Sequence, residues 1–462
     1  MHQKKYLALL FLSLLTEVLF AQTLAKGVVT DRIAVNDSLQ ETYAVYLPED
    51  FNMSQQYPAL FVFDPQGQGQ AAARLLKPVA ASFGALVIAS NTAIPDSLNT
   101  ALEMGRRVLQ DAYNRFPVDQ NQIFTIGLNT GGGLASALAS YVPEVRGLLA
   151  INEVLLNEDA LRNLRQKEVV LYAGDEVVAF YDLENLRKFF KRFGIDNSLY
   201  MYDGGQNWPS SEMLSIGATH LLLNKDSLDQ RQIQQYYRSD LDAADQQVRK
   251  QHYLVAERVF DNLKDKYDGL TDISELKEAQ RTLKRYRAFR KARNAYRNLE
   301  EEEDFLREDF IYYHNNDVAQ AEFENLGWWN VQMAELDRKI SESKKPQEVK
   351  SAKRLKSTLE RLNKFTLIQL KKEPNTLHRQ LFVNILRTLV DPKDYEGFLG
   401  VISLTSRLQD YGSALFYTEE LLKNGFTDYE ALYALEGTSA LELTKDYNTL
   451  IKRYLGKSKY FD

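Results

Sequence analysis

The sequence of 462 residues contains no cysteine, only five histidines and, after its first two dozen residues, no second long apolar run. The absence of cysteine excludes disulfide bonds, thiolate nucleophiles, cysteine metal sites and a lipid-modified N-terminal cysteine. The formal net charge of −6 is small and mixed in sign, which does not indicate a nucleic-acid partner. Apolar residues make up 44% of the chain, enough for ordinary cores, and the length predicts more than one domain.

The first residues have the pattern of a secretory signal peptide. Two lysines at positions 4–5 precede an apolar run over residues 6–15, and Ala21 offers a small residue before a cut ahead of Gln22. The run is short for a membrane span, so an uncleaved anchor is the weaker alternative. We therefore predict a signal peptide over residues 1–21 and an exported mature chain without a transmembrane segment, in the periplasm, outside the cell or at its surface.

Residues 22–225 alternate short β-rich runs with helical patterns. Near-continuous apolar strands separated by helices predict a mostly parallel sheet with helices on both faces. Helices are expected near residues 97–115, 132–142, 181–193 and 210–224, and strands at 27–34, 42–48, 59–64, 85–90, 122–128, 145–151, 168–173 and 198–202.

After residue 225 the pattern becomes helical throughout. Lys, Glu, Arg and Leu recur with a 3.6-residue period, which predicts an all-α region divided into residues 226–372 and 373–462. A stretch of 34 residues from Tyr395 carries Ala414 where two helices could cross closely. Its length and this small residue resemble a tetratricopeptide unit, while a plain helical bundle stays open as the alternative.

Three motifs in the first half point to one family. "YAVYLPEDFN" with "YPALFVFDPQG" has the form of the opening strands and an oxyanion loop. "TIGLNTGGGLA" has the form of a G-x-S-x-G nucleophile turn, and "YDGGQNWPSS" has the form of a loop that carries a catalytic histidine. Together they resemble the α/β-hydrolase family, in particular secreted esterases of the polyhydroxybutyrate-depolymerase type, over residues 40–225. The resemblance implies an α/β-hydrolase domain that cleaves carboxylic esters with a serine, a histidine and an acid.

Each motif departs from the family at the residue that does the chemistry. Asn129 stands at the nucleophile position, where an amide provides no nucleophile although asparagine tolerates the positive φ of the turn. Gln206 stands at the histidine position and cannot accept a proton near neutral pH. Val177 falls at the acid position, with Asp175 or Glu176 as a possible acid if the loop shifts by one or two residues. We therefore expect a degenerate triad and no confident catalytic residue.

The same region offers candidate binding residues around the former pocket. Backbone N–H groups of a glycine-rich loop and side chains near the turn could still contact a ligand. No metal or cofactor is expected. The candidate binding residues are Gln66, Gly67, Asn129, Thr130, Gln206 and Trp208.

These observations predict an exported, catalytically inactive α/β-hydrolase-fold protein, fused to a helical region. It would bind a small molecule or glycan in its former pocket and protein partners of the cell envelope through its helical half. Two alternatives remain: an active secreted carboxylic-ester hydrolase with a non-standard nucleophile, and a structural subunit of an envelope complex.

Overall fold

The computed structural model describes residues 24–35, 40–155, 157–223 and 229–461. The chain separates into two compact units. The first comprises Met1–Gly174 and Ala179–Leu283, and the second comprises Asp175–Val178 and Lys284–Asp462. The predicted signal peptide lies outside the described residues.

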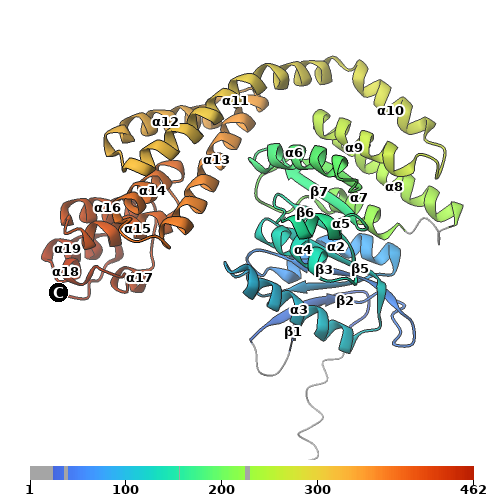
Figure 1. Cartoon of the computed structure of the whole chain (residues 1–462), viewed down its shortest axis with the longest axis horizontal. Helices are drawn as coiled ribbons and strands as arrows, with labels where there is room; N and C mark the ends of the chain where they lie inside the picture. Colours follow the sequence, from blue (N-terminus) through green and yellow to red (C-terminus); the bar gives the residue numbers. More distant parts are fainter. Residues whose placement is uncertain (1–23, 36–39, 156, 224–228, 462) are drawn as a thin grey trace, which may run out of the picture. The chain divides into compact units, whose positions relative to one another are not determined.

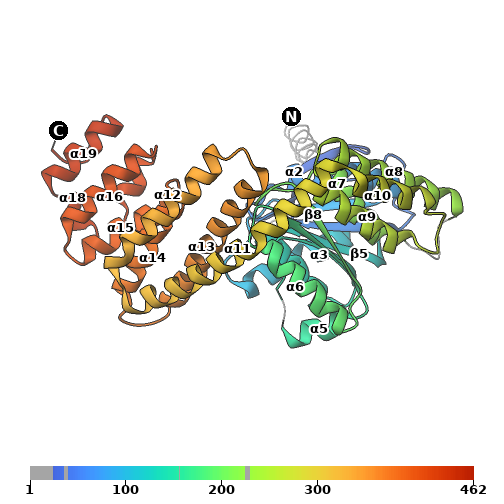
Figure 2. The same cartoon turned by 90° about the horizontal axis from the view of Figure 1, so that it is seen from above.

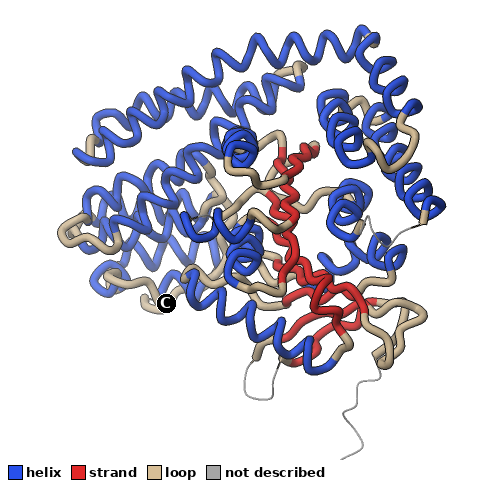
Figure 3. The backbone as a smooth tube through the Cα atoms, turned by 45° about the vertical axis from the view of Figure 1, so that its right-hand side comes forward, coloured by secondary structure: helices blue, strands red, loops and turns tan. Residues whose placement is uncertain are grey.

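The first unit contains an eight-stranded sheet in the order β1-β2-β4-β3-β5-β6-β7-β8 (Figures 1 and 3). β2 pairs antiparallel with β1 and with β4, and all later neighbours are parallel. Together with the covering helices this is the predicted α/β-hydrolase-like fold. The strands are β1 (Val29–Ala34), β2 (Thr42–Tyr46), β3 (Tyr57–Phe63), β4 (Leu86–Ser90), β5 (Val118–Leu128), β6 (Val145–Ile151), β7 (Glu168–Gly174) and β8 (Asn197–Tyr202).

Helices cover this sheet in layers, with α2 packed on α7 and α4 packed between α3 and α5. The sequence patterns predicted four of these helices and missed α2 and α5. The patterns did not reveal α2 because Pro78 lies inside it, and proline ordinarily ends a helix. The helices are α2 (Gly69–Phe83), α3 (Leu98–Arg115), α4 (Thr130–Tyr141), α5 (Glu158–Leu164), α6 (Ala179–Arg192) and α7 (Ser211–Leu222).

Three further helices belong to this unit, α8 (Gln230–Arg249), α9 (Tyr253–Tyr267) and most of α10 (Ser274–Arg285). Lys266 Nζ lies 2.7 Å from Asp240 Oδ2 in a buried ion pair and also donates to the carbonyl of Ile216 in α7. Asn262 donates to the carbonyl of Leu199 in β8. These buried polar contacts hold α8 and α9 against the sheet layer, so the first unit continues past residue 225, where the sequence pattern placed a domain boundary.

The second unit is built from helices, and the described residues after β8 include no strand (Figure 2). Pro346 begins α13, while Pro374 and Pro392 lie between helices, as expected for helix boundaries. The main helices are α11 (Arg287–Gln320), α12 (Leu326–Glu342), α13 (Pro346–Leu370), α14 (Leu377–Val390), α15 (Tyr395–Arg407), α16 (Tyr411–Lys423), α17 (Tyr429–Tyr433), α18 (Ser439–Glu442) and α19 (Lys445–Leu455).

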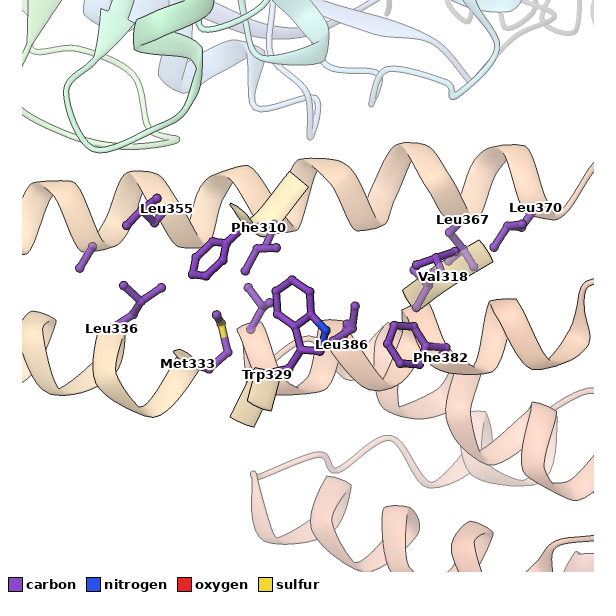
Figure 4. Close-up of a cluster of buried hydrophobic side chains, with 14 residues drawn as sticks. Phe310, Val318, Trp329, Met333, Leu336, Leu355, Leu367, Leu370, Phe382 and Leu386 are labelled. Carbon is purple, nitrogen blue, oxygen red and sulfur yellow. The ribbon is translucent and has the colours of Figure 1, made fainter. Parts of the chain in front are cut away.

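Trp329 is at the centre of the largest described core cluster of this unit (Figure 4). Its side chain is fully buried between Phe310, Met333 and other apolar residues, and its Nε1 donates to Asp317 Oδ2 at 2.8 Å. The indole therefore packs helices together while its one polar atom is satisfied, as buried tryptophans require.

The 34-residue stretch from Tyr395 forms a helix hairpin, α15 and α16. Ala414 is fully buried where the two helices meet, as its small side chain predicted. Among the described residues, no helix is long and apolar enough to cross a membrane.

Candidate functional site

The candidate site begins at the tight turn between β5 and α4. Asn129 occupies its tip with φ 49° and ψ −122°, a conformation that few non-glycine residues adopt. A Cβ on Gly127 would lie 2.0 Å from the carbonyl oxygen of Gly131, and one on Gly131 would lie 2.1 Å from that of Phe63. Both glycines are therefore required for the close approach of strand and helix, and the backbone of a nucleophile elbow is intact.

The side chain of Asn129 is fixed by hydrogen bonds. Its Nδ2 donates to the backbone carbonyl of Gln206 at 3.0 Å, and its Oδ1 accepts from Asn152 Nδ2 at 3.1 Å. Asn152 Oδ1 in turn accepts from the backbone N–H of Gly174 at 2.9 Å. Because a backbone N–H can only donate, this last bond fixes which Asn152 atom is the oxygen and, through it, the orientation of Asn129.

Asn152 is the organising residue of this network, and sequence analysis did not identify it. It follows β6 with a positive φ of 64°, and its Nδ2 also lies 3.0 Å from Tyr202 Oη and 3.1 Å from the carbonyl of Gly205. The Tyr202 hydroxyl donates to Gly205 and Asn207 carbonyls. The chain ends of β5, β6, β7 and β8 are thus linked by amides and one phenol, none of which is a general base at neutral pH.

Gln206 enters this network through its main chain, and its side chain is exposed. Two hydroxyls lie close to the turn in sequence. Thr130 is half-buried at the first position of α4, while Ser136 is buried, donates to the carbonyl of Gly133 and accepts from the backbone N–H of Leu155. The Ser136 hydroxyl therefore serves the local fold.

The acid position falls in the segment Asp175–Val178, which belongs to the second unit. Asp175 is 7% exposed and forms an ion pair with Lys350 of α13, and its carbonyl accepts from Arg354 at 2.6 Å. Val177 is buried and apolar. Glu176 forms an ion pair with Lys353 at 2.7 Å, so both carboxylates considered as a triad acid are paired with lysines of the helical unit.

The loop after β3 is organised by a buried carboxylate, Asp64. Its Oδ1 accepts hydrogen bonds from the backbone N–H groups of Gln66 and Gln68 at 2.9 and 3.0 Å. Its backbone carbonyl accepts a hydrogen bond from the N–H of Gly67. Its Oδ2 accepts from Trp208 Nε1 at 2.7 Å. The N–H groups of this loop, which the sequence predicted to be available to a ligand, instead donate hydrogen bonds to Asp64. The bond from Trp208 joins the loop to the segment after β8.

A polar pocket of about 430 Å³ is lined in part by Gly67 and Gln68 of this loop. Asn91, at the end of β4, donates through Nδ2 to Asp31 Oδ1 at 2.9 Å and to Thr42 Oγ1 at 3.2 Å on its wall. The volume is in the range of small-molecule sites. The lining residues are Asp31, Arg32, Thr42, Gly67, Gln68, Gln70, Ala71 and Asn91.

One imidazole–carboxylate pair lies near the site and was not predicted. His252 Nε2 is 3.1 Å from Asp203 Oδ2, three residues before Gln206, and His252 Nδ1 is 3.2 Å from Gln247 Oε1. Both ring nitrogens of His252 are thus within hydrogen-bond distance of side chains of the fold. Nearby, hydrogen bonds from the Ser210 hydroxyl and its own backbone lower the pKa of Glu212. Within the described part of the chain, no three His, Asp or Glu side chains gather as metal ligands would.

No family model matches this chain, and no curated protein matches it in sequence. Solved structures similar to part of it include a ferulic acid esterase that is 16% identical in sequence. The similarity covers 39% of this chain and 91% of that chain, with a TM-score of 0.34. Another is the fluorophosphonate-binding serine hydrolase FphF of Staphylococcus aureus (12% identity, 43% of this chain, 100% of that chain, TM-score 0.37). A third is the S-formylglutathione hydrolase of Staphylococcus aureus, which is 13% identical in sequence. The similarity covers 43% of this chain and 98% of that chain, with a TM-score of 0.36. By its own sheet order and elbow, the first unit has an α/β-hydrolase-like fold.

Proposed function

We propose that this chain is an exported binding protein in which an α/β-hydrolase unit no longer hydrolyses esters. The observation that carries the proposal is the hydrogen-bonded position of Asn129. Where a serine hydrolase needs a free hydroxyl beside a histidine, this chain holds a carboxamide bonded to Asn152 and to the Gln206 carbonyl. Loss of the nucleophile or of the base alone costs a serine hydrolase about 10⁶ in turnover.

The polar pocket beside the Asp64 loop supports a role in binding. It lies at the carboxyl edge of the sheet, where ligands of open α/β folds bind. Its lining of amides, a hydroxyl and one pair of opposite charges suits a small polar molecule or a glycan rather than an apolar acyl chain. In this proposal the pocket binds such a ligand non-covalently.

The helical unit supplies the protein-binding surface in this proposal. Phe305, Tyr312 and Val331 of α11 and α12 expose 66%, 62% and 63% of their surfaces, which is unusual for large apolar side chains. We propose that they contact a partner in the cell envelope. Replacing all three by serine should abolish cross-linking of the full chain to envelope proteins, whereas the matched change of exposed Lys344 and Lys445 to serine should not.

The catalytic part of the proposal is tested with p-nitrophenyl acetate and butyrate and with a fluorophosphonate probe. The mature chain and Asn129→Ala should show the same background hydrolysis and no covalent label, beside an active serine hydrolase as positive control. Turnover above buffer that disappears in Asn129→Ala, or a label on any residue of the first unit, would establish the alternative of an active esterase.

The binding part is tested by calorimetric titration with neutral oligosaccharides and small polar metabolites. Gln70→Ala and Thr42→Val should weaken any binding that the mature chain shows, whereas Gln235→Ala, on α8 away from this pocket, should not. Equal binding by all variants would place the ligand elsewhere. Failure of every compound to bind, with the envelope contact retained, would favour a structural subunit.

A further inference from the structure

The tripeptide Asp-Ser-Leu occurs three times in this chain, at residues 37–39, 96–98 and 226–228. Any given tripeptide is expected far less than once in a sequence of this length, so the recurrence is a feature to explain. The first and third copies fall between expected elements, and the middle copy falls at the start of the helix expected near residues 97–115. The first and third copies lie outside the described residues, and the middle copy is described in full.

The middle copy is exposed at the start of α3. It ends an irregular segment that begins after β4, and Asp96, Ser97 and Leu98 are all exposed. Leu98 leaves 41% of its surface uncovered, although leucine is ordinarily buried. Ser97 has an extended backbone, with φ −80° and ψ 119°. An enzyme acting on the chain could reach a carboxylate, a hydroxyl and an apolar side chain in succession.

The fold does not use the Ser97 hydroxyl in the way its position predicts. Serine is favoured at a helix N-cap because its oxygen accepts from a first-turn N–H. Ser210 does so at α7, accepting from Met213, and Thr444 does so at α19. Ser97 occupies the same position of α3 and makes no such bond. Helix capping therefore does not explain the serine.

We propose that Ser97 is a site of O-linked glycosylation, an inference that rests on the export part of the proposed function. The Ser97 oxygen bonds to the anomeric carbon of a sugar activated as a diphosphate ester. The bond from that carbon to the diphosphate breaks, the diphosphate leaves with its electron pair, and the serine proton passes to a base of the transferring enzyme. An exposed hydroxyl with no structural bond can take a bulky, solubilising group without disturbing the fold.

The experiment is peptide mapping of the full chain purified from its native cells, with fragmentation that keeps glycans attached. The peptide that contains Ser97 should carry roughly 160 Da or more, the mass of at least one hexose. The Ser97→Ala chain should lose that mass and the Ser97→Thr chain should keep it. Ser210→Ala, which removes a serine that does cap its helix, should keep the modification on Ser97.

Three results would overturn the proposal: a Ser97 peptide found without modification, a mass of about 80 Da that marks a phosphate, or a glycan that remains on this peptide in Ser97→Ala. The same peptide map also identifies the N-terminal residue of the purified chain. A mature start at Gln22 beside an unmodified Ser97 overturns the glycosylation alone, whereas retention of residues 1–21 counts against export and hence against the proposed function.

Discussion

Three helices that follow strands of the first unit begin differently from three helices of the second unit, although each unit also contains helices of the other kind. In the first unit, α2, α3 and α4 begin at the carboxyl edge of the sheet after β3, β4 and β5, and none of their N-cap side chains bonds to the first turn. In the second unit, α15, α16 and α17 each begin with a capping aspartate. The uncapped positions are Gln68, Ser97 and Asn129, and the capped ones are Asp394, Asp410 and Asp428.

Both units also hold buried polar side-chain atoms without a hydrogen-bond partner, such as Tyr113 Oη in the first unit and Asn363 Nδ2 in the second. His314 is fully buried, with Nε2 at 3.0 Å from Asn363 Oδ1, while Asn363 Nδ2 has no hydrogen-bond partner. At an open sheet edge, water or a ligand can accept a hydrogen bond from an unpaired N–H group. In a core, a polar group without a hydrogen-bond partner lowers the stability of the fold. The uncapped first turns of α2, α3 and α4 agree with the proposal that a ligand binds at the sheet edge.

The largest effect is expected at Asn152, which closes the hydrogen-bond network of the first unit. Asn152→Ala leaves the Gly174 N–H without its acceptor, which costs about 1–3 kcal/mol, and places alanine at a positive φ, which costs about 1 kcal/mol more. Unfolding in urea should show a loss of roughly 2–4 kcal/mol from these two causes. Asn152→Gly loses the same bonds without the strain and should be the milder change. Stability equal to that of the parent chain in both variants would mean that the network is not structural.

The second effect is a pH dependence that belongs to the core of the second unit. Burial lowers the pKa of His314 in the folded chain, against the opposing effects of Asn363, Asn315 and Asp317. Above pH 6.5 both folded and unfolded chains hold the neutral ring. As the pH falls below 6.5, the unfolded chain binds a proton that the folded chain does not, so the free energy of unfolding falls by up to about 1.4 kcal/mol per pH unit.

This dependence is measured as the free energy of unfolding at pH 7.5, 6.5 and 5.5. His314→Phe should make the free energy of unfolding depend less steeply on pH below 6.5, because one fewer proton binds on unfolding. His378→Phe removes an exposed histidine of the same unit and serves as the control. A slope unchanged by His314→Phe would show that the buried ring does not cause the acid sensitivity.

The third effect concerns the helix caps of the second unit. The Asp410 side chain accepts from the backbone N–H of Ser413 at 3.0 Å, and hydrogen bonds from the Ser413 hydroxyl and from this N–H lower the pKa of Asp410. Asp410→Ala should destabilise the second unit by about 1 kcal/mol, measured by chemical denaturation. Asp410→Asn keeps an oxygen acceptor and should lose less. If alanine and asparagine behave alike, the cap is not what stabilises α16.

The sequence predicted the parts of the fold that local patterns encode. Eight apolar runs became the eight strands, and the two glycines that flank Asn129 indicated the tight turn because no side chain fits there. α2 was missed because Pro78 interrupts its pattern. The continuation of the first unit beyond residue 225 depends on the buried Lys266–Asp240 pair, which no local period reveals.

At the site, sequence reasoning found the replaced residues but not their partners. Asn152 bonds to groups 22 to 53 residues away in the chain, and these distances arise only from the sheet order. A usable signal was present: Asn152 follows β6 as Asn129 follows β5, and parallel neighbours bring such residues to one edge. The pairing of His252 with Asp203 had no comparable signal, because α9 reads as part of the helical half.

The smallest effect is expected from adding a cap to the uncapped edge of the first unit. Gln68 has ψ 49°, away from the extended backbone that capping serines adopt, as Ser210 does with ψ 155°. Gln68→Ser should therefore raise the stability of the first unit by no more than a few tenths of a kcal/mol, whereas Ser97 already has both the right residue and an extended backbone. A gain as large as the loss in Asp410→Ala would mean that α2 begins like any other helix. A negligible gain would instead show that the backbone of the Asp64 loop, and not the choice of side chain, keeps the first turn of α2 open beside the pocket.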